Sequence, residues 1–368
     1  MTEFNAKCSK FCSDTEADFR IKNNLVHPLE KYWPSGNNKN RRKSKDYNKQ
    51  FNSHPLINPG ACRIRDDSVK DDGALILVKE YTRSAAGTLK PLAKEVRTPD
   101  TLWNTILHLF KRVIKRSDYG WPLIYEFIFD RLRAIRKDAV IQGLADINLI
   151  KILEASVVFY VGADIYFSQI EFEHFDSYMN RYHLNSTLNH LIGLYDRLKV
   201  ISKNRIVFEQ VYLLAEISNP RVLSRFYGLY KTIRDDPGVK TAHSISLGCQ
   251  IGFVHQAFQK LGSLSNLATL TLCLHLPRLR RISLLIFDKG CRSKNLSYSV
   301  DDWKQLCLYN SAKEVTADCF LLNLAVDREG IQFRGQASRE KIPKKNQSYL
   351  PNQIDFNFFE LLEFSLED

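Results

Sequence analysis

The cysteines and histidines near the start of the chain are the first residues whose types could do chemistry. Cys8 and Cys12 lie four positions apart, and the wider neighbourhood adds His27, His54 and Cys62. A structural zinc site needs four ligands, usually supplied as two closely spaced pairs. Because a second close pair is missing, we interpret Cys8 and Cys12 as ordinary reduced thiols and expect no bound metal. Metal binding by this pair is the alternative.

Linear motifs of catalysis are the next pattern to consider. The chain has no G-x-S-x-G nucleophile elbow, no H-E-x-x-H zinc helix and neither of the glycine-rich phosphate-binding loops. Its nine histidines are scattered, so none stands at a fixed spacing from a candidate nucleophile. We therefore predict a protein that is not an enzyme, with no catalytic residue and no cofactor. An active site assembled only in space is the open alternative.

A first basic cluster lies at Lys39, Arg41, Arg42, Lys43 and Lys45. Short basic runs of this kind serve as nuclear import signals or as nucleic-acid patches. The surrounding segment is rich in Asn, Pro, Gly and Lys, so a solvated linker is an equal alternative. We name these five residues as a candidate nuclear-import signal.

A second basic cluster lies further on, at Arg278, Arg280, Arg281, Lys289, Arg292 and Lys294. Contact with phosphates needs only Lys or Arg side chains on one exposed face. The competing interpretation is a solvated helix end, because the helix dipole favours cations near a C-terminus. We name the six residues as candidates for nucleic-acid binding and keep both interpretations.

The composition narrows the class of protein. The chain has 368 residues, 44% of them apolar and 26% charged, and its net charge of +12 favours acidic partners. We find no run of 18 apolar residues and no apolar segment at the start, so we expect neither a membrane span nor a signal peptide. Eight cysteines without a secretion signal indicate reduced thiols and a cytosolic or nuclear protein.

The candidate functional side chains are positioned by the predicted secondary-structure elements. The most clearly predicted element is a helix over residues 121–142. Ile124, Ile128, Leu132 and Ile135 recur at helical spacing and share one narrow face, which predicts a buried structural brace. The opposite side holds basic residues together with acids of the same helix. We therefore expect neutralisation within the helix, and a structural or protein-binding role, for Arg131, Arg133, Arg136, Lys137, Glu126, Asp130 and Asp138.

Helical periodicity also dominates the flanking segments. Residues 1–66 look like a flexible lead, and Leu75, Leu77 and Val78 predict a short docking helix after it. Thr98 with Pro99 and the following acid predicts the start of another helix. From residue 147 onward, helices joined by short turns predict stacked helical hairpins, with Met179 and Tyr182 on one packing stripe.

The pattern of predicted elements changes after Gly262. A helix predicted within residues 267–290, two shorter helices and a hairpin with its tip at 327–330 are typical of a winged-helix module. The predicted fold class is all-α: an α-solenoid of helical hairpins that ends in a winged helix with a small β-hairpin. The end of the chain is either a docking helix or a frayed tail. The predicted segments are a lead at 1–66, the solenoid at 67–267, the winged helix at 268–336 and a tail at 337–368.

Four segments form a pattern when they are taken together, namely VKEYTRSAAG (78–87), FIFDRLRAIRKDAVIQ (127–142), EHFDSYMNRYHL (173–184) and NRIVFEQVYLLAEISN (204–219). Together they resemble the GANP-type family of messenger-RNA-export scaffolds. CSKFCSD (8–14) resembles the Cys-Pro-x-Met-Cys-Pro lead of the family, but Ser9 and Ser13 replace its prolines and Phe11 its methionine.

The resemblance implies that the solenoid of helical hairpins is PCI/TPR-like. It also implies a scaffold that pairs through its winged helix with a second PCI-domain protein and enlists a small acidic proteasome-lid-type peptide. It implies a nuclear protein of messenger-RNA export, present also in the cytoplasm, with RNA as a further open partner and no membrane. The alternative is the short branch of the family, which is linked to centrosome duplication and spindle assembly through protein contacts.

Overall fold

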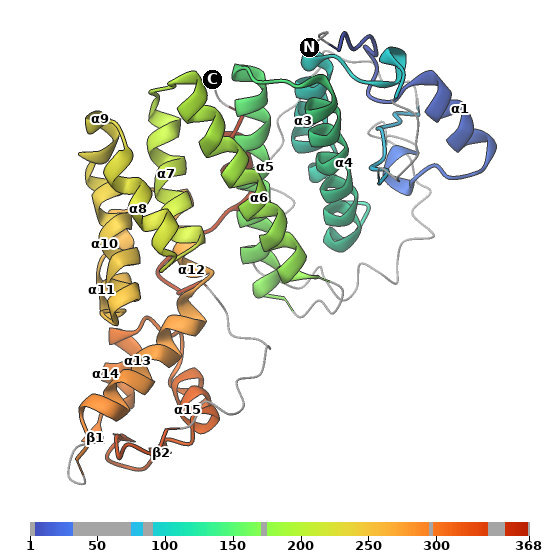
Figure 1. Cartoon of the computed structure of the whole chain (residues 1–368). Coiled ribbons are helices and arrows are strands. Elements are labelled where there is room, and N and C mark those ends of the chain that lie inside the picture. Colours follow the sequence, from blue (N-terminus) through green and yellow to red (C-terminus); the bar gives the residue numbers. More distant parts are fainter. Residues whose placement is uncertain are drawn as a thin grey trace. The chain divides into compact units, whose positions relative to one another are not determined.

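The computed structural model describes residues 4–31, 75–83, 91–170, 175–293, 297–337 and 350–366. Within these residues the chain is mainly helical, with one small antiparallel sheet, as the all-α prediction requires (Figure 1). None of the described helices is long and apolar enough to cross a bilayer. The contacts divide the chain into two compact units, unit 1 (Met1–Ser156 with Phe359–Asp368) and unit 2 (Val157–Phe358). The bounds of the four segments expected from the sequence stay a prediction.

Unit 1 is built around two neighbouring helices, α3 and α4 (Figure 1). In chain order, its elements are α1 (Asp14–Lys22), η1 (Pro28–Glu30), η2 (Ala93–Glu95), α3 (Pro99–Lys111), η3 (Val113–Lys115), α4 (Trp121–Gln142), the start of α5 (Ile147–Ser168) and most of α16 (Phe358–Phe364). Helix α3 begins as predicted: Pro99 stands at its first position, and the hydroxyl of Thr98 accepts from the N–H of Thr101.

Helix α4 buries the predicted apolar face. Ile124, Ile128, Leu132 and Ile135 are all at most 1% exposed. The helix ends at Gly143, whose φ of 65° lies in the left-handed region and lets its N–H reach the carbonyls of the last turn. Burial of these four branched apolar side chains, each worth about 2 kcal/mol, stabilises the packing of α4.

Two expectations for the first part of the chain are wrong in the described residues. Residues 4–31 are not a flexible lead, because they form α1 and η1 and bury both Cys8 and Cys12. Residues 75–83 are extended and not helical. The backbone N–H of Lys7 and that of Cys8 donate to the carbonyls of Ala93 and Val96, at 2.8 and 3.0 Å, so backbone pairing holds the lead in place.

The end of the chain docks as a helix, one of its two predicted alternatives. In α16, Leu361 and Leu362 are at most 5% exposed, and Glu363 pairs with Lys115 at 2.8 Å. The rings of Phe359 and Trp121 lie 5.7 Å apart. Helix α16 therefore covers the start of α4 within unit 1.

Unit 2 continues the helical pattern. Its elements are the end of α5, α6 (Ser177–Leu198), α7 (Lys203–Ala215), α8 (Pro220–Gly228), α9 (Lys231–Arg234), α10 (Pro237–Ile251), α11 (His255–Gln259), η4 (Leu261–Ser263), α12 (Asn266–Cys273), α13 (Leu276–Gly290), β1 (Ser297–Tyr298), α14 (Val300–Leu306), α15 (Ala312–Leu321), β2 (Ala325–Val326) and β3 (Ile331–Gln332). Helix α7 packs against α6, α10 and α12, and its buried Val211 and Leu214 lie at the centre of the unit.

The packing face of α6 differs from the prediction. Met179 and Tyr182 are 39% and 60% exposed, whereas Asn180 is fully buried. The side-chain amide of Asn180 donates to the carbonyl of Tyr160 at 2.8 Å. A satisfied amide can enter the interior at little cost, so Asn180 joins the buried face of α6, which further along the helix is mainly apolar.

The helix predicted within residues 267–290 is two helices. Helix α12 ends at Cys273, and α13 begins at Leu276 with Pro277 in its first turn. Proline lacks the N–H that a continuous helix needs at this point, and its ring excludes the preceding turn. The break redirects the chain into the C-terminal part of unit 2.

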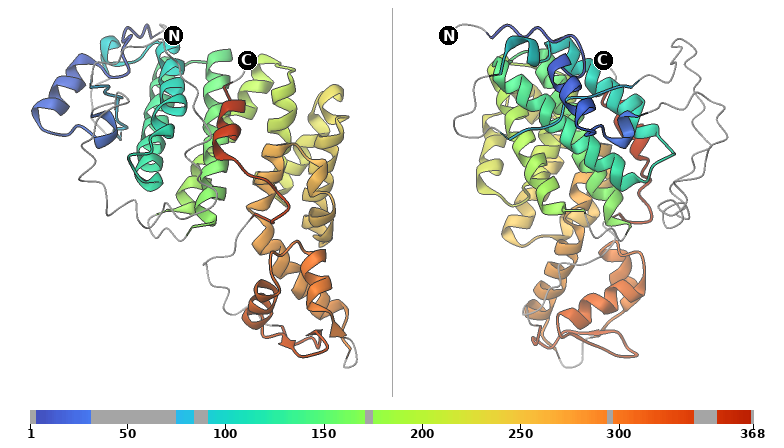
Figure 2. Two further views of the ribbon diagram at one scale, coloured as in Figure 1. Left: turned by 180° about the vertical axis from the view of Figure 1, so that it is seen from behind. Right: turned by 90° about the vertical axis from the view of Figure 1, so that its right-hand side faces the viewer.

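The α13–β3 region (residues 276–337) combines α13, α14 and α15 with the sheet, whose strand order is β1-β3-β2. Figure 2 shows the sheet at one end of these helices. The hairpin forms as predicted, with Val326 paired to Ile331 and Gly330 at its tip. Gly330 has a φ of 131°, and a Cβ there would lie 2.2 Å from the carbonyl oxygen of Tyr298, so only glycine fits.

Candidate interaction sites

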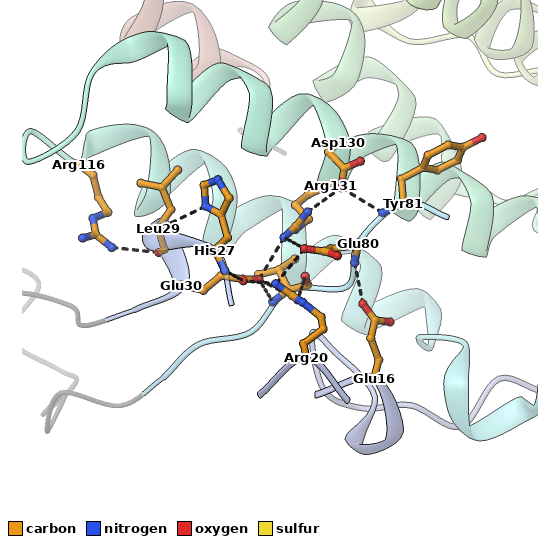
Figure 3. Close-up of polar contacts among 11 residues, drawn as sticks. Glu16, Arg20, His27, Leu29, Glu30, Glu80, Tyr81, Arg116, Asp130 and Arg131 are labelled. Carbon is orange, nitrogen blue, oxygen red and sulfur yellow. Dashed lines mark hydrogen bonds and ion pairs between the residues drawn. The ribbon is translucent and has the colours of Figure 1, made fainter. Parts of the chain in front are cut away.

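A buried polar network joins α4 to the N-terminal segments (Figure 3). Glu30, whose side chain is 1% exposed, accepts from the guanidinium groups of Arg20 and Arg131. It also accepts from the backbone N–H of Val78 at 2.8 Å. Arg20 and Arg131 both reach Glu80, at 3.0 and 3.2 Å, so opposite charges surround each of these buried groups. Such a network is stable only while every member keeps its partners.

Carboxylates from distant segments also hold the extended backbone of residues 75–83. Beside the bond from Val78, the N–H of Glu80 donates to Glu16 at 2.9 Å and that of Tyr81 to Asp130 at 3.1 Å. These bonds replace the N–H partners that a helix would have supplied. This is the physical reason why the predicted helix does not form.

The charges of α4 are neutralised both within the helix, where Arg131 pairs with Asp130 at 2.6 Å as expected, and from outside it. Asp138, fully buried, accepts from Lys79 at 2.7 Å and from Arg97 at 2.8 Å. Arg133 lies over the ring of Tyr81 at 3.9 Å. The polar side of α4 is therefore a docking face for residues 75–83 and for Arg97, and the structural role predicted for its charges fits.

The titratable groups beside this network are unsuited to acid–base or nucleophilic chemistry. Burial, together with the charge of Arg131, lowers the pKa of His27 to about 4, so the ring is neutral and its Nδ1 accepts from the N–H of Leu29 at 3.2 Å. Burial raises the pKa of Cys12 to about 12, which keeps the thiol protonated and unreactive. The described residues hold no group of three or more His, Cys, Asp or Glu that could bind a metal.

Two of the six candidate nucleic-acid residues point into the α13–β3 region. Arg280 is fully buried, donates to the carbonyls of Cys307 (3.1 Å) and Leu308, and lies over the ring of Tyr309. Arg281 is 9% exposed and pairs with buried Asp318 at 2.8 Å. Their guanidinium groups bind α14, α15 and the turn between them, so we withdraw both residues as contacts for phosphates.

The other candidates divide between the surface and residues outside the description. Arg278, Lys289 and Arg292 are exposed. Arg292 lies close against Gly335, where a Cβ would be 2.6 Å from its Nε. Lys294 lies outside the described residues, as do Lys39, Arg41, Arg42, Lys43 and Lys45.

An exposed apolar spot on the α13–β3 region was missed by the sequence reasoning. Phe320 on α15 is 81% exposed, and Val326 on the edge strand β2 is 36% exposed. Phe320 stands in the run CFLL, whose other members suit a core, so apolar periodicity alone does not mark it. An exposed large aromatic side chain near an open sheet edge is typical of a protein-docking surface.

The fold and these sites define a mainly helical protein whose buried charges serve its architecture. A family model described as SAC3/GANP family matches residues 11–328. The match covers most of the chain, so the chain belongs to the SAC3/GANP family, in agreement with the resemblance in its sequence.

Curated relatives extend this finding. The chain is 25% identical over 226 residues to the protein named Protein xmas of Drosophila melanogaster, a match that covers 59% of this chain and 11% of the relative. It is 22% identical over 287 residues to SAC3 family protein 1 of Schizosaccharomyces pombe, covering 71% of this chain and 27% of the relative. The chain thus spans about a tenth and about a quarter of the lengths of these relatives.

Proposed function

We propose that this chain is a non-enzymatic scaffold subunit of the messenger-RNA-export type. The observation that carries the proposal is the family match over residues 11–328, which runs from the N-terminal lead to the hairpin of the α13–β3 region. The two units, stabilised by cores and buried ion pairs, suit a protein that holds others in place.

The scaffold pairs with a second PCI-domain protein through the α13–β3 region, which acts as a winged helix at the end of a PCI-like solenoid. Three helices and a three-stranded antiparallel sheet support this assignment. Phe320, 81% exposed, supplies the apolar anchor that such an interface needs at its centre.

Acidic partners and a nuclear location complete the proposal. The net charge of +12 favours a small acidic proteasome-lid-type peptide and RNA. Arg278, Lys289 and Arg292, all exposed, are the candidate RNA contacts that remain in the α13–β3 region. The nucleus is the proposed location, with a further cytoplasmic pool.

Affinity purification of the tagged full chain, followed by mass spectrometry, tests the scaffold role. We expect a PCI-domain protein and a small acidic peptide at stoichiometric amounts, together with messenger-RNA-export factors. Recovery of the chain without any PCI-domain protein would contradict the proposal. Recovery of centrosomal and spindle proteins in place of export factors, with location at the centrosome, would favour the alternative role in centrosome duplication and spindle assembly.

A further inference from the structure

A second group of cations, in unit 2 and outside the α13–β3 region, lies where two turns meet. The first turn joins α6 to α7, and the second joins α8 to α9. Arg205 at the start of α7 donates to the carbonyl of Val200 at 2.7 Å in the first turn, and its guanidinium carbon lies 5.7 Å from the ring centre of Tyr230 in the second. Residues 197–203 and 227–231 therefore share one part of the surface.

The acids of this part of unit 2 are already paired. Asp196 accepts from Arg205 and Arg225 at 2.5 and 2.6 Å. Burial opposes the ionisation of Asp196, but the two guanidinium groups hold its pKa below the usual value. Glu209, 1% exposed, binds the same two arginines. Two arginines and two carboxylates neutralise each other, so the network leaves no negative charge for its neighbours.

Four exposed cations surround this neutral network, namely Arg197, Lys199, Lys203 and Lys231. None of them forms an ion pair with the described residues. The nearby acid Asp235 pairs with Lys240 at 3.1 Å, and the charges of Arg234 and Lys231 also help to lower its pKa. Four exposed positive charges beside a neutral network and one such acid leave an excess of positive charge, which attracts a polyanion.

Exposed aromatic rings accompany these cations. Tyr227 and Tyr230 are 66% and 43% exposed. Arg205 lies beneath Tyr230, whereas Tyr227 rests edge-on against Phe226 and His243 and leaves part of its ring open to solvent. Rings on which bases stack, set beside cations that contact the backbone, are the pattern that binds single-stranded nucleic acid without sequence preference.

We propose that Arg197, Lys199, Lys203 and Lys231, with Tyr227 and Tyr230, form a binding surface for single-stranded RNA. The inference rests on the RNA-binding part of the proposed function and assigns it to the turns of unit 2. An acidic peptide would use the cations but would gain nothing specific from stacking on the rings. We refer to these six residues as the turn surface.

Fluorescence anisotropy with a labelled oligouridylate of about 15 nucleotides and the full chain tests the turn surface. The first variant is R197Q/K199N/K203Q/K231Q, in which asparagine suits the left-handed φ of 53° at position 199. We expect a rise in Kd of at least about tenfold, and a plot of log K against log salt that is shallower by about 3, since each contact to a single strand contributes about 0.7.

The matched control removes the same charge from exposed lysines of unit 1 in K7Q/K22Q/K94Q/K111Q. This variant should bind as the unchanged chain does. R278Q/K289Q/R292Q, which removes the candidate contacts of the α13–β3 region, should weaken binding less than the turn-surface variant does. Tyr227→Leu should weaken binding on the order of tenfold and Tyr227→Phe should restore it, because stacking needs only the ring. Circular dichroism shows which variants fold. If the fourfold variant does not fold, single replacements of Lys203 and Lys231 are measured in its place.

Wild-type affinity in the fourfold turn-surface variant would overturn the inference. Loss of binding in R278Q/K289Q/R292Q alone would move RNA to the α13–β3 region, which leaves the proposed function intact. Binding of a polyglutamate peptide in place of RNA would overturn the inference in favour of an acidic protein partner. Capture of a PCI-domain protein is measured in a separate experiment. Failure of the proposed scaffold role can therefore be distinguished from failure of the RNA-binding inference.

Discussion

The arginines around α4 and the cations of the turn surface have the same charge but different surroundings. Arg20 and Arg131 are at most 4% exposed at their side chains and share the carboxylates of Glu30 and Glu80. Lys199 and Lys203 are exposed. The carboxylates of the nearest network are already paired with Arg205 and Arg225. Both regions are rich in cations. They differ in whether carboxylates lie close enough to pair with those cations.

Mutations in the two regions should change different properties of the protein. Loss of a buried charge in the α4 network leaves another charge buried and unpaired, so stability changes. Loss of a charge on the turn surface leaves nothing unpaired, so binding changes and stability does not.

Leu132→Asp has the largest expected effect, because it places a lone carboxylate on the apolar face that the charges of α4 avoid. Leu132 is fully buried, so we expect a loss of more than about 4 kcal/mol and a chain that does not fold. Solubility and circular dichroism measure this. A soluble Leu132→Asp protein with cooperative unfolding would show that this face is not a core.

Glu30→Gln should cost about 3–5 kcal/mol in the free energy of unfolding, since it removes the charge that Arg20 and Arg131 share in the interior. Chemical denaturation measures the change. Glu80→Gln is the matched control, because Glu80 is 38% exposed and should cost less than about 1 kcal/mol. Equal costs for the two variants would remove the distinction between buried and solvated pairing.

His27 gives the same region a pH dependence. Its pKa of about 4 in the folded chain lies below the value of about 6.5 in the unfolded chain, so the unfolded chain binds the proton first. Stability from the neutral ring is complete above about pH 6.5 and is lost as pH falls toward 4.

His27→Asn keeps an acceptor for the N–H of Leu29 and removes the titration. We expect its unfolding free energy to lose about 1 kcal/mol less than that of the unchanged chain between pH 7 and pH 5, allowing for partial exposure of the ring. Denaturation at the two pH values measures it. Identical slopes for the two proteins would show that His27 does not contribute to the acid sensitivity of unit 1.

Sequence patterns predicted those features that depend on neighbours a few positions apart. Apolar spacing of three and four located α4 and its buried face, and the residues around Gly330 located the hairpin. Features that depend on distant partners were missed. Residues 75–83 are extended because Glu30, 48 positions from Val78, accepts from their backbone. Arg281 is buried because Asp318, 37 positions away, neutralises it.

The candidate interaction sites also depend on distant partners. The basic cluster around α13 was predicted to bind nucleic acid, but Arg280 and Arg281 are buried. The exposed Phe320 had no distinguishing pattern in the sequence. Exposure is a property of the packed chain, and one sequence specifies it only where periodicity is strong.

The scaffold account is tested most directly by capture of the PCI-domain partner with Phe320→Asp and Phe253→Asp. Both phenylalanines are exposed, at 81% and 64%, and both lie in unit 2, so each change should alter stability by no more than about 0.5 kcal/mol. We expect Phe320→Asp to reduce the captured partner by at least about tenfold and Phe253→Asp to capture it as the unchanged chain does. Equal capture by the two variants would contradict the assignment of the α13–β3 region as the docking surface.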